Sequence, residues 1–264
     1  MLDLEDVDLK NGMFNLSFAK GLNVLFAFRG SQSTMSLSEL AGALDISISS
    51  AQRTVYTLEK LGLIQKSPKT RKYRLTLRVL ELANNFISAD PLVEAANPFL
   101  AELSNITGET AVLTEPLDNE MVYVSRIVAA KFIPIHMPTG SRIPMYCTGS
   151  GRAYLSALPD DQIRRILASS NLKRHTQWTE TDPVRLFEII QEVRRVGIAQ
   201  NKEELFLGDM TIAAPIIGRS GMPVACVHIV APTSRWTLEE ARARLQPALL
   251  DCARGIANAV RAST

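Results

Sequence analysis

The densest concentration of charge in this chain lies between residues 46 and 78. The segment has eight lysines and arginines and one acidic residue, Glu59, so it carries +7. The net charge of all 264 residues is only +2, which leaves −5 for the rest of the chain. A local excess of positive charge is the electrostatic footprint expected of a surface that contacts phosphates.

Polar side chains suited to DNA contact recur within this segment. Glutamine and arginine reach base edges or phosphate oxygens, and small residues at a helix start let the backbone approach the double helix. A run of basic residues is by itself most often a solvated surface, so the surrounding elements decide between the two interpretations. The candidates are Ser47, Ser49, Ser50, Gln52, Arg53 and Tyr56 on an expected helix, and Lys69, Arg71 and Lys72 in the turn that follows.

Two helices are expected to hold these residues. Ser36 can cap the first helix, and Glu39 is placed to complete a capping box. Asp45 and Ile46 form the turn, and Ser47 can cap the second helix, which Gly62 ends. Helical spacing predicts the buried face of the second helix, which consists of Ala51, Val55, Leu58 and Leu61.

Two short strands, 63–66 and 72–75, are predicted after these helices, with the basic turn 67–71 between them. Two helices followed by a small basic hairpin form the outline of a winged helix-turn-helix. In such a unit the second helix enters the major groove. The sequence therefore predicts contact with double-stranded DNA, with the basic turn as the wing.

Length and composition restrict the remaining possibilities. A chain of 264 residues with 46% hydrophobic and 21% charged residues is expected to form about two globular domains. It has no apolar run long enough for a membrane span, and its acidic N-terminus is not a signal peptide. Three widely spaced cysteines, and three histidines without metal-ligand spacing, predict a cytoplasmic protein with no disulfide framework, metal site or cofactor.

The pattern of the sequence changes near residue 91. Alternating segments separated by helical ones predict an α+β domain with an antiparallel sheet and flanking helices. The expected parts of the chain are a disordered arm (1–16), the winged helix-turn-helix (17–76), a linker helix (77–90) and a second domain (91–264). The strands predicted in the second domain are 110–113, 121–127, 132–135, 211–217 and 223–231, and the helices are 92–105, 152–158, 160–168, 183–196 and 238–260.

A glycine-rich turn, residues 148–151, precedes one of these helices. Backbone N–H groups at the start of a helix bind anions, although an ordinary helix cap has the same sequence pattern. Arg126 and Arg142 could pair with a ligand carboxylate, but each is more often a surface or ion-paired arginine. His228, in an apolar strand, is by itself most often a hydrogen-bonded core histidine.

An enzyme and a ligand-free interaction module are the alternatives to a ligand-binding domain. Cys147 and His228 could be imagined in a nucleophilic site, but no spacing supports it. The chain has no Gly-x-Ser-x-Gly, P-loop or paired-histidine motif, so no catalytic activity is predicted. A protein-interaction module would differ from a sensor only in lacking a ligand cavity.

Several motifs, in order along the chain, resemble the isocitrate-lyase-regulator (IclR) family of bacterial transcription factors. They are SFAKGLNVLFAF, LSELAGALDISISSAQRTVYTLEKLGLI, YRLTLRVLELA, GSRIPMYCTGSGRAYLSAL and RRVGIAQNKEELFLGDMTIAAPIIGRSGMPVACVHIVAP. The resemblance extends from Ser17 to about Val260. Within the family, AKGLNVLFAF, LTLRVLELA and RIPMYCTGSGRAYLSAL are most similar to the PcaR/PobR-like branch, which controls aromatic-acid catabolism.

The resemblance implies a winged helix-turn-helix joined by a linker helix to a GAF-like effector-binding domain. Such regulators act as homodimers or dimers of dimers on palindromic operators, and they switch with a small organic acid. In the family the ligand pocket lies over one face of the sheet. The residues implied to line it are Gly149, Ser150, Asn201, Thr211, His228 and Val230, with Phe132, Ile135 and Ile143 as an apolar wall.

Three positions depart from family members that respond to glyoxylate or pyruvate. Those members carry an acidic residue in place of Asn201 and serines in place of His228 and Val230. The loss of a carboxylate and a hydroxyl and the gain of an imidazole favour a larger, aromatic acid over a small keto acid. An aliphatic keto acid remains the alternative effector.

Overall fold

The computed structural model describes residues 11–29, 32–129, 135 and 137–262. The chain divides between Phe86 and Ile87 into two compact units. Most of the predicted arm, 1–16, lies outside the described residues. None of the described helices combines the length and the apolar character that a membrane span requires.

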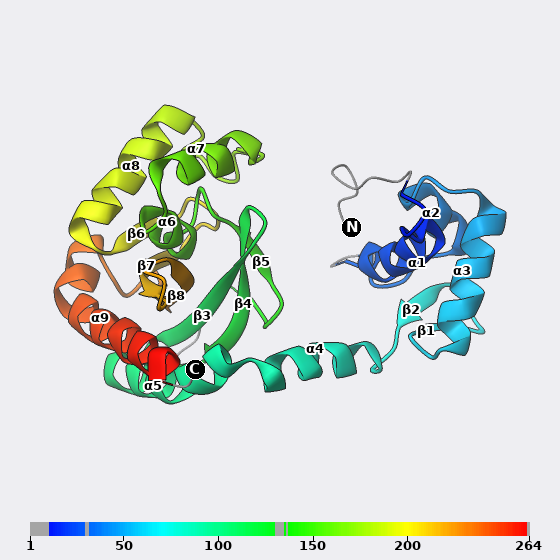
Figure 1. The fold of residues 1–264 in the computed structure, drawn as a ribbon, viewed down its shortest axis with the longest axis horizontal. Helices are drawn as coiled ribbons and strands as arrows, with labels where there is room; N and C mark the ends of the chain where they lie inside the picture. Colours follow the sequence, from blue (N-terminus) through cyan, green and yellow to red (C-terminus); the bar gives the residue numbers. More distant parts are fainter. Residues whose placement is uncertain (1–10, 30–31, 130–134, 136, 263–264) are drawn as a thin grey trace. The chain divides into compact units, whose positions relative to one another are not determined.

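The first unit packs helices against a small antiparallel sheet (Figure 1). Leu40, Val55 and Ile64 are almost completely buried in its core. This arrangement confirms the predicted helix-turn-helix with a wing. Its elements are α1 (Leu16–Ala27), α2 (Leu37–Ala43), α3 (Ile48–Lys60), β1 (Ile64–Lys66) and β2 (Tyr73–Leu75).

Local hydrogen bonds fix the ends of α2 and α3 as the sequence predicts. Ser36 Oγ accepts from the N–H of Glu39 at 3.2 Å, and the Glu39 carboxylate accepts from the N–H of Ser36 at 2.6 Å. These two bonds form the capping box. Ser47 Oγ accepts from the N–H of Ser50 at 3.2 Å, and α3 ends before Gly62, whose φ is +74°.

Leu61 is an exception to the predicted buried face of α3. Ala51, Val55 and Leu58 are buried, whereas Leu61 is 55% exposed. At about 100° per residue, position 61 lies roughly 80° around the helix from Ala51, beyond the stripe that faces the core. The prediction for Leu61 is therefore wrong, and its side chain lines a surface groove with residues of α1.

Helix α4 (Val79–Ala89) corresponds to the linker helix expected at 77–90. None of its residues is buried, and the division between the two units falls within it. Its leucines Leu80 and Leu82 are exposed. Only its C-terminal part meets a core, where the half-buried Ile87 packs against the apolar cluster of the second unit.

The second unit is built on an antiparallel sheet with strand order β5-β4-β3-β8-β7-β6. Helices α5 and α9 lie side by side on one face, and α6, α7 and α8 lie on the other (Figure 1). The result confirms the predicted α+β class. The elements are α5 (Pro91–Thr107), β3 (Thr110–Leu117), β4 (Glu120–Ile127), β5 (Arg142–Pro144), α6 (Gly149–Ser156), α7 (Asp160–Ser169), α8 (Pro183–Val196), β6 (Ala199–Lys202), β7 (Met210–Ile217), β8 (Pro223–Val230) and α9 (Leu238–Ala262).

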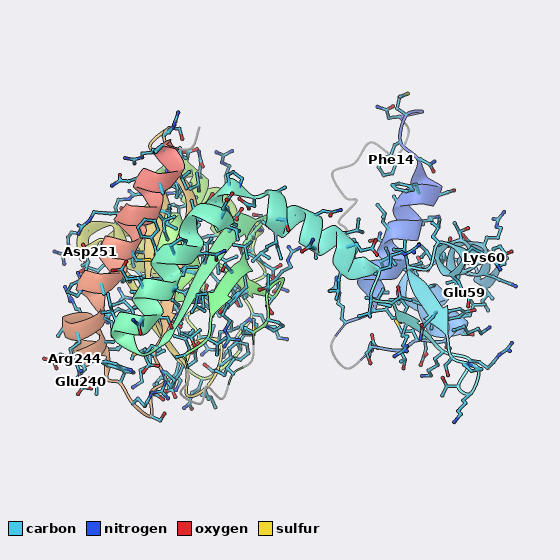
Figure 2. All side chains as sticks on the ribbon, turned by 90° about the horizontal axis from the view of Figure 1, so that it is seen from below. Phe14, Glu59, Lys60, Glu240, Arg244 and Asp251 are labelled. Atoms are coloured by element: carbon cyan, nitrogen blue, oxygen red, sulfur yellow. The ribbon has the colours of Figure 1, made fainter. Side chains whose placement is uncertain are left out.

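Each face of this sheet has a core of its own. Helix α9 buries Leu245 and Leu249 against one face, while Glu240, Arg244 and Asp251 lie on its solvent side (Figure 2). A separate apolar cluster fills the space between the opposite face and α6. The second cluster surrounds the cavity described below.

The second unit differs from the predictions at two unpredicted strands, one helix start and one predicted strand. The sequence does not predict β5 or β6, because both are short edge strands without a clear alternation. The helix predicted at 152–158 begins instead at Gly149, since Thr148 Oγ1 caps it by accepting from the N–H of Gly151. The strand predicted at 132–135 lies outside the described residues except for Ile135, which is in no strand.

Candidate DNA interface and effector pocket

The exposed side of α3 carries the polar residues predicted to contact DNA. Burial of Ala51 and Val55 fixes the rotation of the helix, so Gln52, Arg53 and Tyr56 project into solvent. Their side chains are free to reach base edges and phosphates. The residues that line one hollow of this surface are Ser49, Gln52, Arg53, Tyr56 and Thr57.

The two ends of α3 add to this surface in different ways. At the start, Ser47 Oγ lies 3.1 Å from Ser49 Oγ, and both residues are exposed, while Ser50 is half-buried. At the end, Lys60 Nζ lies 5.3 Å from the centroid of the Tyr56 ring. Figure 2 shows Lys60 at the surface of the unit. This cation–π contact, which the sequence does not predict, places a positive charge beside the residues predicted to contact DNA.

The turn between β1 and β2 presents Lys69 and Arg71 to solvent. The backbone of Ser67 fixes its shape, because its N–H donates to the Lys72 carbonyl at 2.8 Å and its carbonyl accepts from the N–H of Arg71 at 3.0 Å. Lys72 itself is drawn toward α2, with Nζ 3.2 Å from a carboxylate oxygen of Glu39. Of the three predicted wing cations, Lys69 and Arg71 are therefore exposed, and Lys72 forms an ion pair with Glu39.

Eight of the nine residues expected to line the effector pocket surround a single cavity of the second unit. Phe132, the ninth, lies outside the described residues. The cavity lies where α6 begins over β7, because a Cβ atom on Gly149 would come within 2.5 Å of Thr211 Oγ1. The eight residues are Ile135, Ile143, Gly149, Ser150, Asn201, Thr211, His228 and Val230.

Strand register assembles this cavity from segments that are far apart in the sequence. Val112 of β3 pairs with Arg126 of β4 on one side and with His228 of β8 on the other. Residues in one such row point to the same face of the sheet. Thr211 of β7 pairs with Val230 of β8 in a neighbouring row of the same face.

Several buried polar atoms at the cavity have no hydrogen-bond partner among the described residues. They are Ser150 Oγ, both ring nitrogens of His228 and Nε of Arg126. Ser150 and His228 are each only 1% exposed, and Arg126 is held by one bond from Nη1 to the Met137 carbonyl at 3.1 Å. An unpaired buried polar group costs free energy, so a ligand that pairs with these atoms is favoured.

His228 is neutral in this environment. Burial, with a smaller contribution from the positive charge of Arg126, lowers the pKa of His228 to about 3. The neutral ring offers one donor and one acceptor. Its edge meets the ring of Tyr123, with the centroids 5.4 Å apart. His228 is thus buried, but it has no hydrogen-bond partner among the described residues, unlike the hydrogen-bonded core histidine that its strand position alone suggests.

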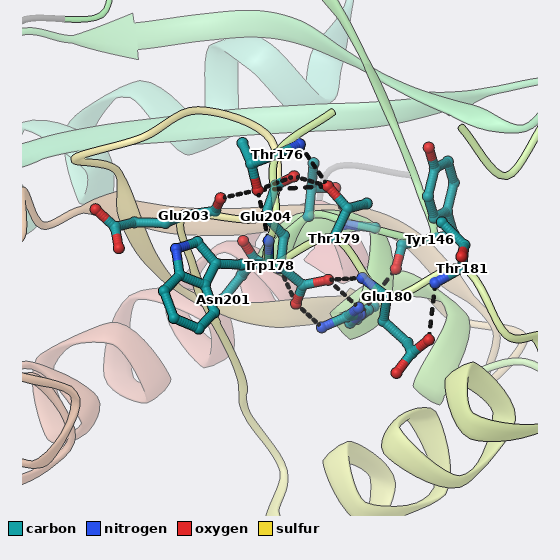
Figure 3. A network of polar contacts seen from close by, with 12 residues as sticks. Tyr146, Thr176, Trp178, Thr179, Glu180, Thr181, Asn201, Glu203 and Glu204 are labelled. Atoms are coloured by element: carbon teal, nitrogen blue, oxygen red, sulfur yellow. Dashed lines mark hydrogen bonds and ion pairs between the residues drawn. The ribbon is translucent and has the colours of Figure 1, made fainter. Parts of the chain in front are cut away.

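Glu204 is the centre of a polar network beside the cavity (Figure 3). Its carboxylate accepts from both terminal nitrogens of Arg152, at 2.5 and 2.8 Å, from Asn201 Nδ2 at 2.9 Å and from the N–H of Glu180 at 3.0 Å. One N–H donor of Asn201 is therefore used within the protein. The acidic group absent at position 201 is present on Glu204, three residues further along the chain.

Arg152 and Glu204 are not predicted from the sequence, because charged residues are usually exposed. Arg152 is 2% exposed and also donates from Nε to the Tyr146 carbonyl at 2.8 Å. One feature of the sequence could have indicated that Arg152 is buried. It lies in the first turn of α6, directly after the glycine-rich turn that packs onto the sheet.

The cavity is narrow, with about 30 Å³ open to a molecule the size of water. A ligand larger than a few water molecules can enter only when lining side chains move. Leu205 and Phe206 are well placed to do so, because they belong to the loop between β6 and β7.

The two arginines considered as carboxylate partners have different surroundings. Arg142 is paired at the surface with Asp118, at 3.0 Å, and with Glu120, at 2.5 Å, and its side chain is 43% exposed. Arg126 lines the cavity. Arg142 is therefore an ion-paired surface residue, and Arg126 is available to a ligand.

The nucleophile alternative gains no support from the surroundings of Cys147. Burial raises the pKa of its thiol to about 12, and a protonated thiol is a poor nucleophile. Within the described ranges, no group of three histidine, cysteine or acidic side chains is arranged to hold a metal ion.

A winged helix-turn-helix followed by an antiparallel α+β domain with a cavity over one face defines a transcriptional regulator with an effector-binding domain. The family model for the IclR helix-turn-helix domain matches residues 17–68, and that for the bacterial transcriptional regulator IclR C-terminal region matches residues 84–258. The chain belongs to the IclR family of bacterial transcriptional regulators, which is not a family of enzymes.

Among curated relatives, the Pca regulon regulatory protein of Pseudomonas putida is 32% identical over 244 residues, covering 92% of this chain and 83% of that protein. A solved structure from Rhodococcus sp. RHA1, described as that of a transcriptional regulator, is 33% identical with a TM-score of 0.83, covering 95% of this chain and all of that one. An IclR homologue from Microbacterium hydrocarbonoxydans, solved with 4-hydroxybenzoate, shares the fold at 22% identity and a TM-score of 0.78, covering 93% of this chain and 99% of that one.

Proposed function

We propose that this regulator contacts its operator through α3 and the β1–β2 turn, and that a small aromatic acid in the α6 cavity changes its DNA binding. The observation that carries the proposal is the group of buried polar atoms at that cavity that have no hydrogen-bond partner among the described residues. Residues 17–76 would act as the DNA-binding module, 77–90 as the linker and 91–264 as the effector module. A homodimer or dimer of dimers would match a palindromic operator.

The aromatic class of the acid is supported by the cavity wall. Ile135, Ile143 and Val230 supply apolar surface for a ring, and Ser150 and His228 supply polar groups to the same cavity. The Pseudomonas putida relative regulates a pca regulon by its name, and the Microbacterium homologue holds 4-hydroxybenzoate. These make hydroxybenzoates the first compounds to test.

The DNA part of the proposal is tested by Arg53→Ala. Arg53 projects from α3, and the loss of a bidentate base contact costs about 1–3 kcal/mol of specific binding. Gel-shift titration at fixed salt, on an operator selected from random DNA, measures the change. Arg165→Ala removes the same charge from the surface of α7 in the other unit and serves as the control. Unchanged operator affinity for Arg53→Ala would exclude Arg53 from the interface.

The effector part is tested by calorimetry with 4-hydroxybenzoate, protocatechuate, pyruvate and glyoxylate. Ser150→Asp adds a negative charge to the cavity and should weaken the binding of an acid, in either orientation, by at least about 1 kcal/mol. Ser220→Asp, in the exposed β7–β8 turn, is the matched control. Equal affinity in Ser150→Asp and the parent would reject the cavity, and binding of keto acids alone would reject the aromatic class.

A further inference from the structure

Two charged residues of opposite sign line the effector cavity without pairing with each other. Arg126 belongs to β4, and Asp209 immediately precedes β7. Because β3 and β8 lie between these strands, the two backbones are three strand spacings, or roughly 14 Å, apart across the sheet, and Asp209 is displaced further along β7, since the residue in the row of Arg126 is Ala213. Neither side chain forms an ion pair with any described residue at the cavity. The cavity is therefore positive on one side and acidic on the other.

Arg126 has unused hydrogen-bonding capacity. Its Nη1 bond to the Met137 carbonyl orients the guanidinium, while Nε is buried and has no partner among the described residues. A guanidinium has five N–H donors in a fixed fork that matches a carboxylate. It lies in the same row of side chains as His228, whose nitrogens are also unpaired. This side of the cavity offers donors and a positive charge to an anion.

Asp209 is a buried acid that can accept a hydrogen bond from a ligand. Burial raises the pKa of its carboxyl to about 6, so it is mostly ionised near neutral pH but pays for its desolvation. A hydrogen-bond donor on a ligand would stabilise the carboxylate. The loop 203–208 fixes its position, because the N–H of Glu203 donates to the Asp209 carbonyl at 2.7 Å. This side of the cavity offers an acceptor.

The start of α6 lies on the acidic side. Gly149 touches Thr211, and Asp209 is two residues before Thr211, so both point to the same face of the sheet. An acid that directed its carboxylate to the α6 turn would bring it toward Asp209 and leave Arg126 unpaired. The reverse orientation satisfies both charges.

We infer that the effector is an acid with a hydrogen-bond donor at its far end, such as a hydroxybenzoate, whose carboxylate binds Arg126 and whose donor binds Asp209. This inference rests on the proposed function, because it names the ligand class and the orientation within the same cavity. Arg126 and Asp209 are then the residues that determine specificity, and Ser150 and His228 contact the ligand between them.

The experiment is a calorimetric comparison of benzoate and 4-hydroxybenzoate on the full chain. The parent should prefer 4-hydroxybenzoate. Arg126→Gln should weaken both acids by at least about tenfold, the scale of one charge-assisted hydrogen bond. Arg126→Lys should recover part of the loss, because it keeps the charge without the fork. Arg142→Gln, which changes an ion-paired surface arginine, is the control and should leave both affinities unchanged.

Asp209→Asn separates the two orientations. If the donor of the ligand binds Asp209, the variant should lose the preference for 4-hydroxybenzoate and bind benzoate about as the parent does. If the carboxylate lies beside Asp209, removal of the negative charge should strengthen benzoate binding, which would overturn the inference. Thermal unfolding followed by tryptophan fluorescence verifies that each variant is folded.

The outcomes also distinguish this inference from the proposed function. Binding of both acids with no effect of Arg126→Gln would overturn the inference and leave the aromatic effector standing. Failure of every aromatic acid to bind the parent would overturn both.

Discussion

The DNA-binding unit and the effector unit hold their polar functional groups in opposite environments. On α3, Gln52 and Arg53 are exposed, and short local hydrogen bonds fix the helix that carries them. At the cavity, Ser150 and His228 are almost completely buried, and their side-chain polar atoms have no hydrogen-bond partner among the described residues. An exposed basic surface suits a polyanion, whose binding releases counterions. A buried polar site suits a small ligand, which must replace the hydrogen bonds of water.

Because of this difference in burial, substitutions on the exposed surface of α3 should affect DNA binding with little effect on stability, whereas substitutions at the cavity should affect both binding and stability. A change on the exposed surface of α3 removes a contact with DNA and little else. A change at the cavity alters ionisation, packing and ligand binding together, because each group is desolvated. The four predictions below test this contrast.

The largest expected effect is that of Arg152→Met. The substitution leaves the carboxylate of Glu204, 12% exposed, without its ion-pair partner, and breaking a buried pair costs about 3–5 kcal/mol. Urea unfolding followed by tryptophan fluorescence measures the cost, since both tryptophans, Trp178 and Trp236, lie in the effector unit. Arg142→Met, at the surface, should cost at most about 1 kcal/mol. Equal losses in the two variants would contradict the burial argument.

The next effect is a pH dependence that depends on His228. Its pKa is lowered to about 3 in the folded protein, whereas an unfolded histidine titrates near 6.5. The unfolded state therefore binds more protons below pH 6.5, and the folded state loses stability as pH falls toward 3. Between pH 7 and pH 5 this loss amounts to about 2 kcal/mol.

His228→Phe removes this loss. As the pH falls from about 7 to about 5, the unfolding free energy of the variant should therefore rise relative to that of the parent by about 2 kcal/mol. Burial raises the pKa of Asp209 to about 6, and burial with the nearby Asp90 raises that of Glu115 to about 7. Both carboxyls act with the opposite sign, since the folded state binds their protons more tightly. They are present in both proteins and cancel in the difference. If the difference in unfolding free energy between the two proteins stays constant over this pH range, the pKa of His228 is not lowered in the folded protein.

A smaller effect is expected from the wing. Lys69→Ala with Arg71→Ala should lower the slope of log affinity against log salt by about two, near 0.9 for each phosphate contact. Adding Lys72→Ala should change it less, because Lys72 is shared with Glu39. Specific and non-specific DNA should weaken alike. The pair Arg165→Ala and Arg185→Ala, on α7 and α8, is the control, and an unchanged slope for the wing variant would exclude backbone contact.

The smallest effect is that of Ser47→Ala, which removes the cap of α3. The loss should be about 1 kcal/mol of local stability. Hydrogen exchange of the α3 amides measures it, because neither tryptophan lies in this unit. Ser49→Ala keeps the cap and serves as the comparison. Equal protection of these amides in both variants would contradict the capping role.

Features that depend on neighbouring residues could be predicted from the sequence, and features that depend on distant residues could not. The capping box of α2, the cap of α3 and the glycine at its end are all fixed by residues within a few positions of one another. The predicted burial of Leu61 is wrong, because only the packing of α3 shows where its buried face ends. The edge strands β5 and β6 are not predicted, because pairing with another strand, rather than their own residue pattern, makes them strands.

The sequence by itself determined the α+β class, the helix-turn-helix with its basic face and the glycine-rich turn, because each depends on local spacing and composition. Only the tertiary structure decided that Arg126 faces the cavity while Arg142 faces solvent, that Glu204 holds Asn201, and that His228 is neutral. The physical reason is that register between distant strands sets which side chains meet. Burial, which sets their charge, is a property of the folded chain rather than of any segment.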